Sequence, residues 1–177
     1  MGELHGGKFV IVMKRLILVL TMVMLACTTV YADKKKKLNQ DTDSFRYDIE
    51  YCQNASDGMV LVKVWSYSKR SDLAMKQCRK NAVHGVIFRG YAGEGTASHR
   101  PLVSDPTIES VKADYFEAFF ADEGPYARYV GSMMDGSAEV RKVGKEYKVG
   151  VVVSVNKQML RKHLEDAGIV RSLSSGF

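Results

Sequence analysis

Histidine, serine and aspartate residues gather in one glycine-containing stretch of the sequence, residues 90–106. His99 follows Ser98 and is followed by Asp105, and these residue types act as base, nucleophile and orienting acid in hydrolases. No nucleophile elbow surrounds Ser98, and the ordinary composition of a loop accounts for the same residues. The stretch therefore has two interpretations. It is an irregular turn, or it is a small hydrolase or ligand-binding site with His99 and Arg100 as candidate binding residues.

The other histidines and the glycines of this stretch lack the spacing of a metal or phosphate site. The sequence contains no HExxH and no CxxC, and no second histidine lies within one helical turn of His163. His84 ends a predicted helix, where the helix dipole favours a cation. Gly93 and Gly95 are followed by no Gly-Lys-Ser/Thr, so they predict a turn rather than a phosphate loop. We expect no metal, no cofactor and no catalytic residue, which leaves enzymatic activity open and favours a non-catalytic protein.

Cys52 and Cys78 are the two cysteines downstream of the predicted leader, and an exported chain can oxidise such a pair to a disulfide. Closing this loop would stabilise the fold by roughly 3 kcal/mol. Cys52 shares the polar face of its predicted strand, whereas Cys78 shares the apolar face of its predicted helix, which opposes the bridge. Because Cys52 ends its strand, where the alternation can lapse, a bridge and two free thiols both remain open.

Trp65 and Tyr67 lie on one face of a predicted strand, and three alternating valines lie on its other face. One of these faces must point away from the core unless both are covered. An exposed pair of aromatic side chains is a candidate docking surface for a protein partner. The alternative is a second covering layer over this face, such as residues 90–106.

Hydrophobic periodicity places these residues on an α+β domain. Strands are predicted at residues 45–52, 59–67, 126–133, 138–143 and 147–155. Helices are predicted at residues 71–85, 107–120 and 156–167, and residues 86–88 either finish the first helix or form a short strand. The hairpin-like turns predict an antiparallel sheet of about five strands with two to three helices packed mainly on one face, a two-layer sandwich.

The strand at residues 147–155 is strongly apolar, so we expect it at the centre of the sheet with the following helix as its nearest cover. Asn156 is expected to cap that helix at its beginning, and Gly168 to end it. In the helix that begins at residue 71, Lys76, Arg79 and Lys80 are expected to face solvent.

Residues 1–32 predict an export signal. Residues 13–15 are a short basic region, residues 16–26 are apolar, and a small-residue cleavage pattern ends the segment. Met13 is an alternative start of translation. The apolar run is shorter than the about 20 residues of a membrane span. An uncleaved leader, or a lipid attached to Cys27, would nevertheless anchor the chain to a membrane.

The rest of the chain divides into a flexible basic tether at residues 33–44, a single domain at residues 45–171 and a disordered tail at residues 172–177. Without the three basic and one acidic residue of the leader, the net charge falls from +6 to +4, and the lysines at 34–37 supply four positive charges. The folded part is nearly neutral, so no nucleic-acid partner is predicted. The lysine run indicates a solvated tail, or a contact with anionic lipid.

Two segments resemble small cell-envelope domains. Residues 73–88, with the sequence LAMKQCRKNAVHGVIF, and the strand YKVGVVVSV at 147–155 are similar to the N-terminal domain of the flagellar outer-membrane T-ring protein and to related small bacterial lipoproteins. That family pairs a helix containing Asn-Ala-Val with an antiparallel sheet. The resemblance implies an exported, non-catalytic interaction or assembly module, periplasmic or extracellular, with outer-membrane association as an alternative. It implies an envelope protein as partner and transfers no site residue.

Overall fold

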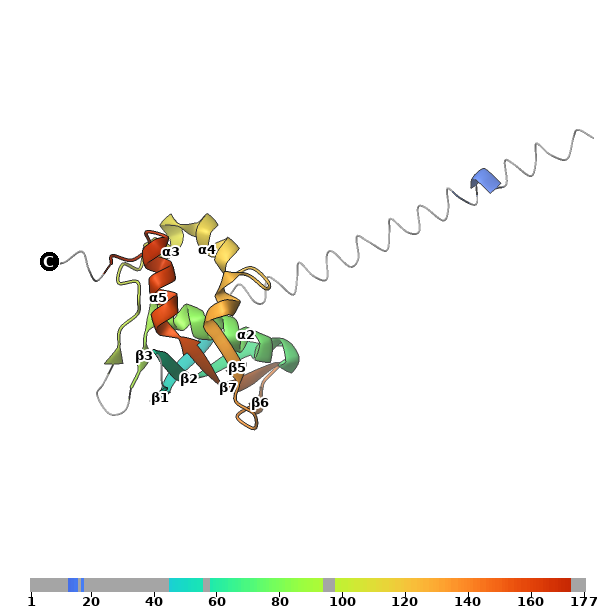
Figure 1. Cartoon of the computed structure of the whole chain (residues 1–177). Coiled ribbons are helices and arrows are strands. Elements are labelled where there is room, and N and C mark those ends of the chain that lie inside the picture. Colours follow the sequence, from blue (N-terminus) through green and yellow to red (C-terminus); the bar gives the residue numbers. More distant parts are fainter. Residues whose placement is uncertain (1–12, 16, 18–44, 56–57, 94–97, 173–177) are drawn as a thin grey trace, which may run out of the picture. The chain divides into compact units, whose positions relative to one another are not determined.

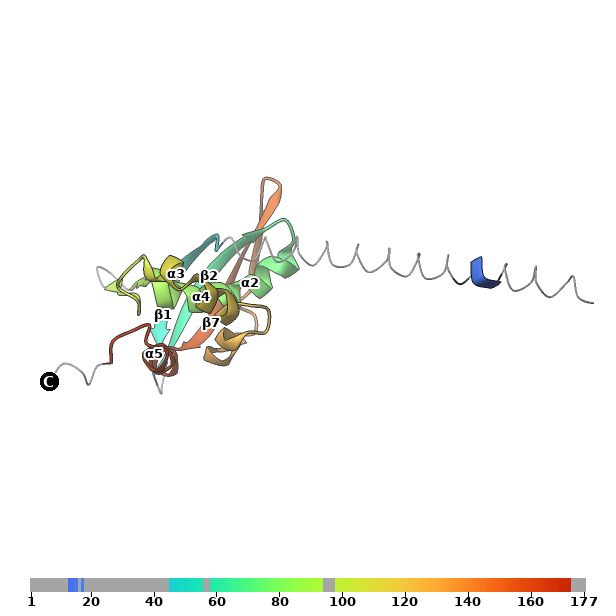
Figure 2. The same cartoon turned by 90° about the horizontal axis from the view of Figure 1, so that it is seen from above.

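A computed structural model describes residues 13–15, 17, 45–55, 58–93 and 98–172. The chain divides into two units, Met1–Ser44 and Phe45–Phe177, and the strands and helices described below belong to the second (Figure 1, Figure 2). The predicted tether, Cys27 and most of the predicted leader and tail lie outside the described residues. Within the described ranges, no helix is long and apolar enough to cross a membrane.

The sheet is built around β2 (Met59–Ser68) and β7 (Glu146–Asn156), which pair antiparallel along the whole of β2. Alternate residues of both strands are apolar, so one face of the pair is a continuous band of valines. This band is fully buried, which confirms the predicted central strand. The facing pairs are Val60 with Val155, Val62 with Val153, and Val64 with Val151.

Five shorter strands complete the sheet. β1 (Tyr47–Asn54) pairs with β2, and β3 (Tyr91–Ala92) pairs parallel with β1 and antiparallel with β4 (Ser98–His99). β5 (Val130–Met133) and β6 (Glu139–Val143) both pair with β7, β5 along its second half and β6 along its first. The predicted α+β class is confirmed, but the expected sheet of about five antiparallel strands is not: among the described residues the sheet has seven strands and is mixed. Two-residue strands are too short to show a periodicity, and pairing between β1 and β3 depends on a crossover through a helix.

Helices cover the face of the sheet that carries the valine band. α2 (Ser71–His84) packs against β2 and β7 and continues into a π-helical turn, η1 (Gly85–Arg89). Figure 1 shows α3 (Ile108–Val111), α4 (Ala113–Phe119) and α5 (Lys157–Asp166) together at the end of the sheet away from the β6–β7 turn. The prediction that Lys80 faces solvent was wrong. Lys80 is 7% exposed, with its Nζ 5.3 Å from the centre of the Phe45 ring.

The structure corrects the bounds of one predicted helix and one predicted strand. The pattern at residues 107–120 is divided into α3 and α4 at Lys112, so there are more helices than expected. The predicted strand at residues 126–133 begins only at Val130, after a 3₁₀ helix, η2 (Pro125–Tyr129). The two tyrosines of η2 are three residues apart, so one helical turn places both against the phenylalanines at the end of α4.

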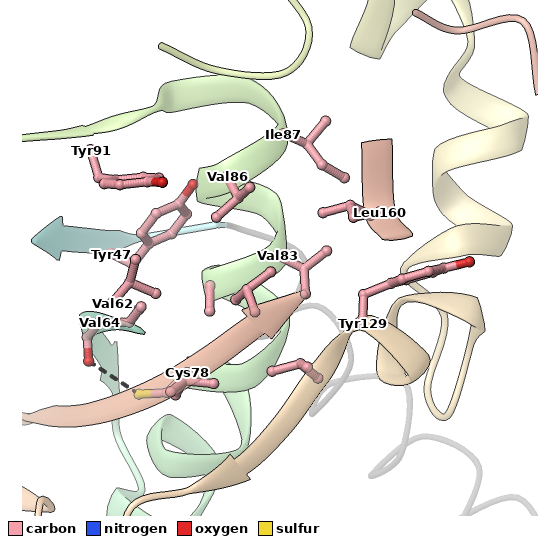
Figure 3. Close-up of a cluster of buried hydrophobic side chains, with 14 of the residues drawn as sticks. Tyr47, Val62, Val64, Cys78, Val83, Val86, Ile87, Tyr91, Tyr129 and Leu160 are labelled. Atoms are coloured by element: carbon pink, nitrogen blue, oxygen red, sulfur yellow. Dashed lines mark hydrogen bonds between the residues drawn. The ribbon is translucent and has the colours of Figure 1, made fainter. Parts of the chain in front are cut away.

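The core lies between the valine band and α2, as Figure 3 shows for Val62, Val83 and Ile87. The main cover of β7 comes from α2 rather than from the following helix, and α5 adds its buried Leu160 and Leu164. The ends of α5 are as predicted. The Asn156 Oδ1 accepts a hydrogen bond from the Met159 N–H at 2.9 Å, and Gly168 follows the helix at φ +67°.

Candidate functional site

His99, the predicted base of a hydrolase, lies on β4 and stacks on two tyrosines. Its ring centre is 4.7 Å from those of Tyr51 and Tyr91. In the part of the chain that the structure describes, no hydrogen bond joins His99 to a carboxylate. Asp105 instead accepts from the Thr107 N–H at 2.9 Å and from its hydroxyl at 2.7 Å. Residues of the right type are present in this loop, but they are not assembled into a catalytic group.

Ser98 and Arg100, on either side of His99, are both exposed. No hydrogen bond joins either of them to His99 within the described residues. The stretch from residue 90 is also less irregular than expected, because β3 and β4 form a short hairpin in it. Beyond the hairpin, the Leu102 and Val103 N–H groups donate to carbonyls of η1 at 3.1 and 2.9 Å, which fixes this part of the loop to the end of α2.

Trp65 lies on the outer face of the sheet, defined here as the face opposite α2, yet it is only 7% exposed. Its ring lies against Gly150 of β7, where an added Cβ would be 2.6 Å from two ring atoms. Lys63, Lys148 and Arg141 place their charged ends 4.6, 5.1 and 5.2 Å from the ring centre. Long cationic side chains therefore cover the indole, and no loop is needed to bury it.

Tyr67 and the charged residues around Trp65 form hydrogen bonds and ion pairs with neighbouring side chains. The Tyr67 hydroxyl and the Lys148 ammonium donate to Asp48 at 2.7 and 3.0 Å, and they hold the pKa of that carboxyl below its usual range. The Trp65 Nε1–H donates to Glu50 at 3.2 Å. On β6, Glu139 pairs with Lys63 and Arg141. The predicted aromatic docking surface is thus a network of ion pairs in which the tryptophan is covered.

Cys52 and Cys78 are free thiols. Cys78 is buried beneath α2 with its sulfur 3.5 Å from the Val64 carbonyl oxygen, and burial raises the pKa of the thiol (Figure 3). Cys52 stands at the irregularity of the β1 pairing, near Lys63 and Glu50 of the outer face. The sheet lies between the two sulfurs, so the two unpaired thiols, one of the alternatives left open, are what the structure contains.

A hydrogen-bonded chain of Tyr47, His84 and Glu109 was missed in the sequence. The Tyr47 hydroxyl is 2.7 Å from His84 Nδ1, and His84 Nε2 is 2.9 Å from Glu109 Oε1. Burial lowers the pKa of His84 and raises that of Tyr47, whereas the bond to His84 lowers the pKa of Glu109. A neutral imidazole that accepts from the tyrosine and donates to the carboxylate satisfies all three groups.

These three hydrogen-bonded side chains have the form of an acid–base relay. However, Tyr47 and His84 are only 5% and 3% exposed. A substrate cannot reach them, so the arrangement fastens β1, α2 and α3 together. Phe45 closes it from one side, with its ring stacked 3.8 Å from that of His84. Arg89 donates to the Phe45 carbonyl at 2.9 Å and to the Tyr47 carbonyl at 3.1 Å. The first residues of the folded unit are thereby tied to the end of α2.

An open groove of about 570 Å³ lies between α2 and the β5 edge of the sheet. Its floor includes Val151 of β7, and methionines line its walls, Met75 from α2 and Met133 and Met134 from β5 and the turn after it. Arg79 adds a cation. Its guanidinium donates to the Val130 carbonyl at 3.4 Å, and its Nε is buried without a hydrogen-bond partner. Within the described ranges, no carboxylate lies within ion-pairing distance of Arg79.

The groove could not be recognised in the sequence. It depends on how β5 and β6 pair with different parts of β7 and leave a gap between them. The adjacent methionines at 133 and 134 were the only local signal. Within the described residues, no group of three or more histidine, cysteine, aspartate or glutamate side chains could hold a metal ion. Comparison of the chain with protein-family models, with curated protein sequences and with solved structures finds no match.

Proposed function

We propose that this chain is an exported, non-catalytic interaction module of the cell envelope, and that it contacts its partner through the groove between α2 and β5. The export pattern at residues 1–32 and the resemblance of residues 73–88 to envelope domains support the location. The contact surface is supported by the groove itself.

The observation that carries the proposal is the contrast between this groove and the other polar and aromatic groups of the domain. His84, Trp65 and His99 are each engaged with neighbouring side chains. The groove, in contrast, presents methionine side chains and a cation without a carboxylate partner among the described residues. Flexible thioether side chains adapt to varied apolar partners, and they are common at binding surfaces.

The alternative, a small hydrolase or ligand-binding protein that uses residues 90–106, would require the His99 ring to leave its stack on Tyr51 and Tyr91. No observation on that loop favours it over the groove.

A photo-crosslinking amino acid at Ser132, an exposed residue beside the groove, tests the proposal in cells that produce the chain. We expect a crosslink to an envelope protein and recovery of the chain in the envelope or extracellular fraction. The matched control carries the same amino acid at Lys162, an exposed position on α5. Equal crosslinking from both positions would refute the groove as the contact surface, and recovery in the cytoplasm would refute export.

A further inference from the structure

The groove lies beside a strand with an open edge. β5 ends the sheet, and within the described residues no strand pairs with its side away from β7. An unpaired strand edge offers backbone N–H and C=O groups in the spacing that an extended peptide can use. The side chains of Ser132 and Met134 are exposed, so they leave access to this edge.

The groove beside this edge lies on the α2 side of the sheet. A strand added to β5 would direct every second side chain toward that side, at intervals of about 7 Å. Those side chains would meet the methionine walls, with Met75 on α2 and Met133 on β5. An apolar side chain of the added strand could therefore be buried between these two methionines.

Arg79 indicates which charge a peptide bound along β5 would carry. Its guanidinium reaches the Val130 carbonyl of β5 at 3.4 Å, so the cation stands at the strand. Among the described residues it has no carboxylate partner, and its Nε–H is buried without an acceptor. A half-buried guanidinium in such a site favours a carboxylate, because a charge-assisted hydrogen bond satisfies both the charge and the donors.

We propose that β5 binds an extended peptide segment of a partner protein by strand addition, with an apolar side chain in the methionine groove and an Asp or Glu two residues away against Arg79. Strand addition supplies sequence-independent affinity through backbone hydrogen bonds, and the groove and Arg79 supply the selectivity. This inference rests on the proposed function, since it specifies the partner segment for the same groove.

The probe is a phage-displayed library of random twelve-residue peptides, selected on the purified full chain. We expect the enriched peptides to share an apolar residue two positions from an Asp or Glu. A fluorescent synthetic peptide of the enriched sequence should bind in an anisotropy titration. Arg79→Gln should weaken its affinity by at least about ten-fold, the loss expected for one charge-assisted hydrogen bond. Arg128→Gln, a change at an exposed cation of η2 that does not line the groove, should leave the affinity unchanged. Circular dichroism of both variants verifies that they are folded.

Hydrogen exchange then tests the binding mode. Addition of a strand should protect backbone amides of Val130–Met133 when the synthetic peptide binds. Binding without this protection would overturn strand addition, and so would a library from which no such pattern emerges. Binding of dodecanoate to a chain that enriches no peptide from the library would identify the groove as a lipid site instead. A dimer in light scattering that Ser132→Arg dissociates would identify a second copy as the occupant. A crosslink from position 132 to an envelope protein, together with any of these results, would keep the proposed function and refute only the strand-addition mode.

Discussion

Replacement of Trp65 by alanine tests the burial of an indole on the outer face of the sheet. The ring is 7% exposed and rests on Gly150, so its removal leaves a cavity on the sheet surface. Large-to-small changes at buried tryptophan cost about 3–5 kcal/mol. The side chains above the ring, Lys63, Lys148 and Arg141, are long and flexible and can move into part of the space. We therefore expect the lower end of that range, about 3 kcal/mol.

The expected change in melting temperature follows from the size of the folded unit. A unit of roughly 130 residues has an unfolding entropy near 0.27 kcal/mol/K, so a loss of about 3 kcal/mol lowers Tm by about 10 °C. Thermal unfolding followed by circular dichroism measures this shift. The control is Tyr67→Phe on the same face, which removes one exposed hydrogen bond to Asp48 and should lower Tm by no more than about 4 °C.

The single tryptophan of the chain provides a second readout. Its fluorescence should be blue-shifted in the folded protein and should move to the red on unfolding, because the ring is shielded from water. A Trp65→Ala variant with the Tm of the parent protein would show that the ring contributes no packing. In that case the outer face would again be a candidate docking surface.

Three further predictions concern other contacts. Gly150→Ala should destabilise the fold by about 1–3 kcal/mol in urea unfolding, because the new methyl group would collide with the Trp65 ring; an unchanged midpoint would refute this close contact. Since burial lowers the pKa of His84, the unfolded chain binds its proton first as pH falls below about 6.5, and stability should be lost from there downward. Urea midpoints between pH 8 and pH 5 measure this loss, and a His84→Gln variant with the same slope would contradict the assignment. Iodoacetamide should modify the half-buried Cys52 of the native protein before the buried Cys78, which should react only on unfolding. Mass spectrometry of timed samples distinguishes the two, and equal rates would refute the difference in burial.

The candidate site shows how little of its geometry was encoded locally. The methionines at 133 and 134 and the cation at 79 are separated by more than fifty residues, and they meet only because α2 lies over β7 beside β5. The Tyr47–His84–Glu109 chain likewise joins three elements, and its two hydrogen bonds span 37 and 25 positions of sequence. No pattern of residues close together in the sequence predicts such contacts.

What the sequence by itself determined is the character of each long element. Alternating valines defined β2 and β7 as strands, and Asn156 marked the beginning of α5. These features depend on neighbours two to four residues away, which the sequence displays directly. The tertiary structure alone decided the parallel pairing of β3, the division of the sheet edge between β5 and β6, and the cover of Trp65 by cations. Each of these depends on which distant segments share one layer, and periodicity within a segment carries no information about that.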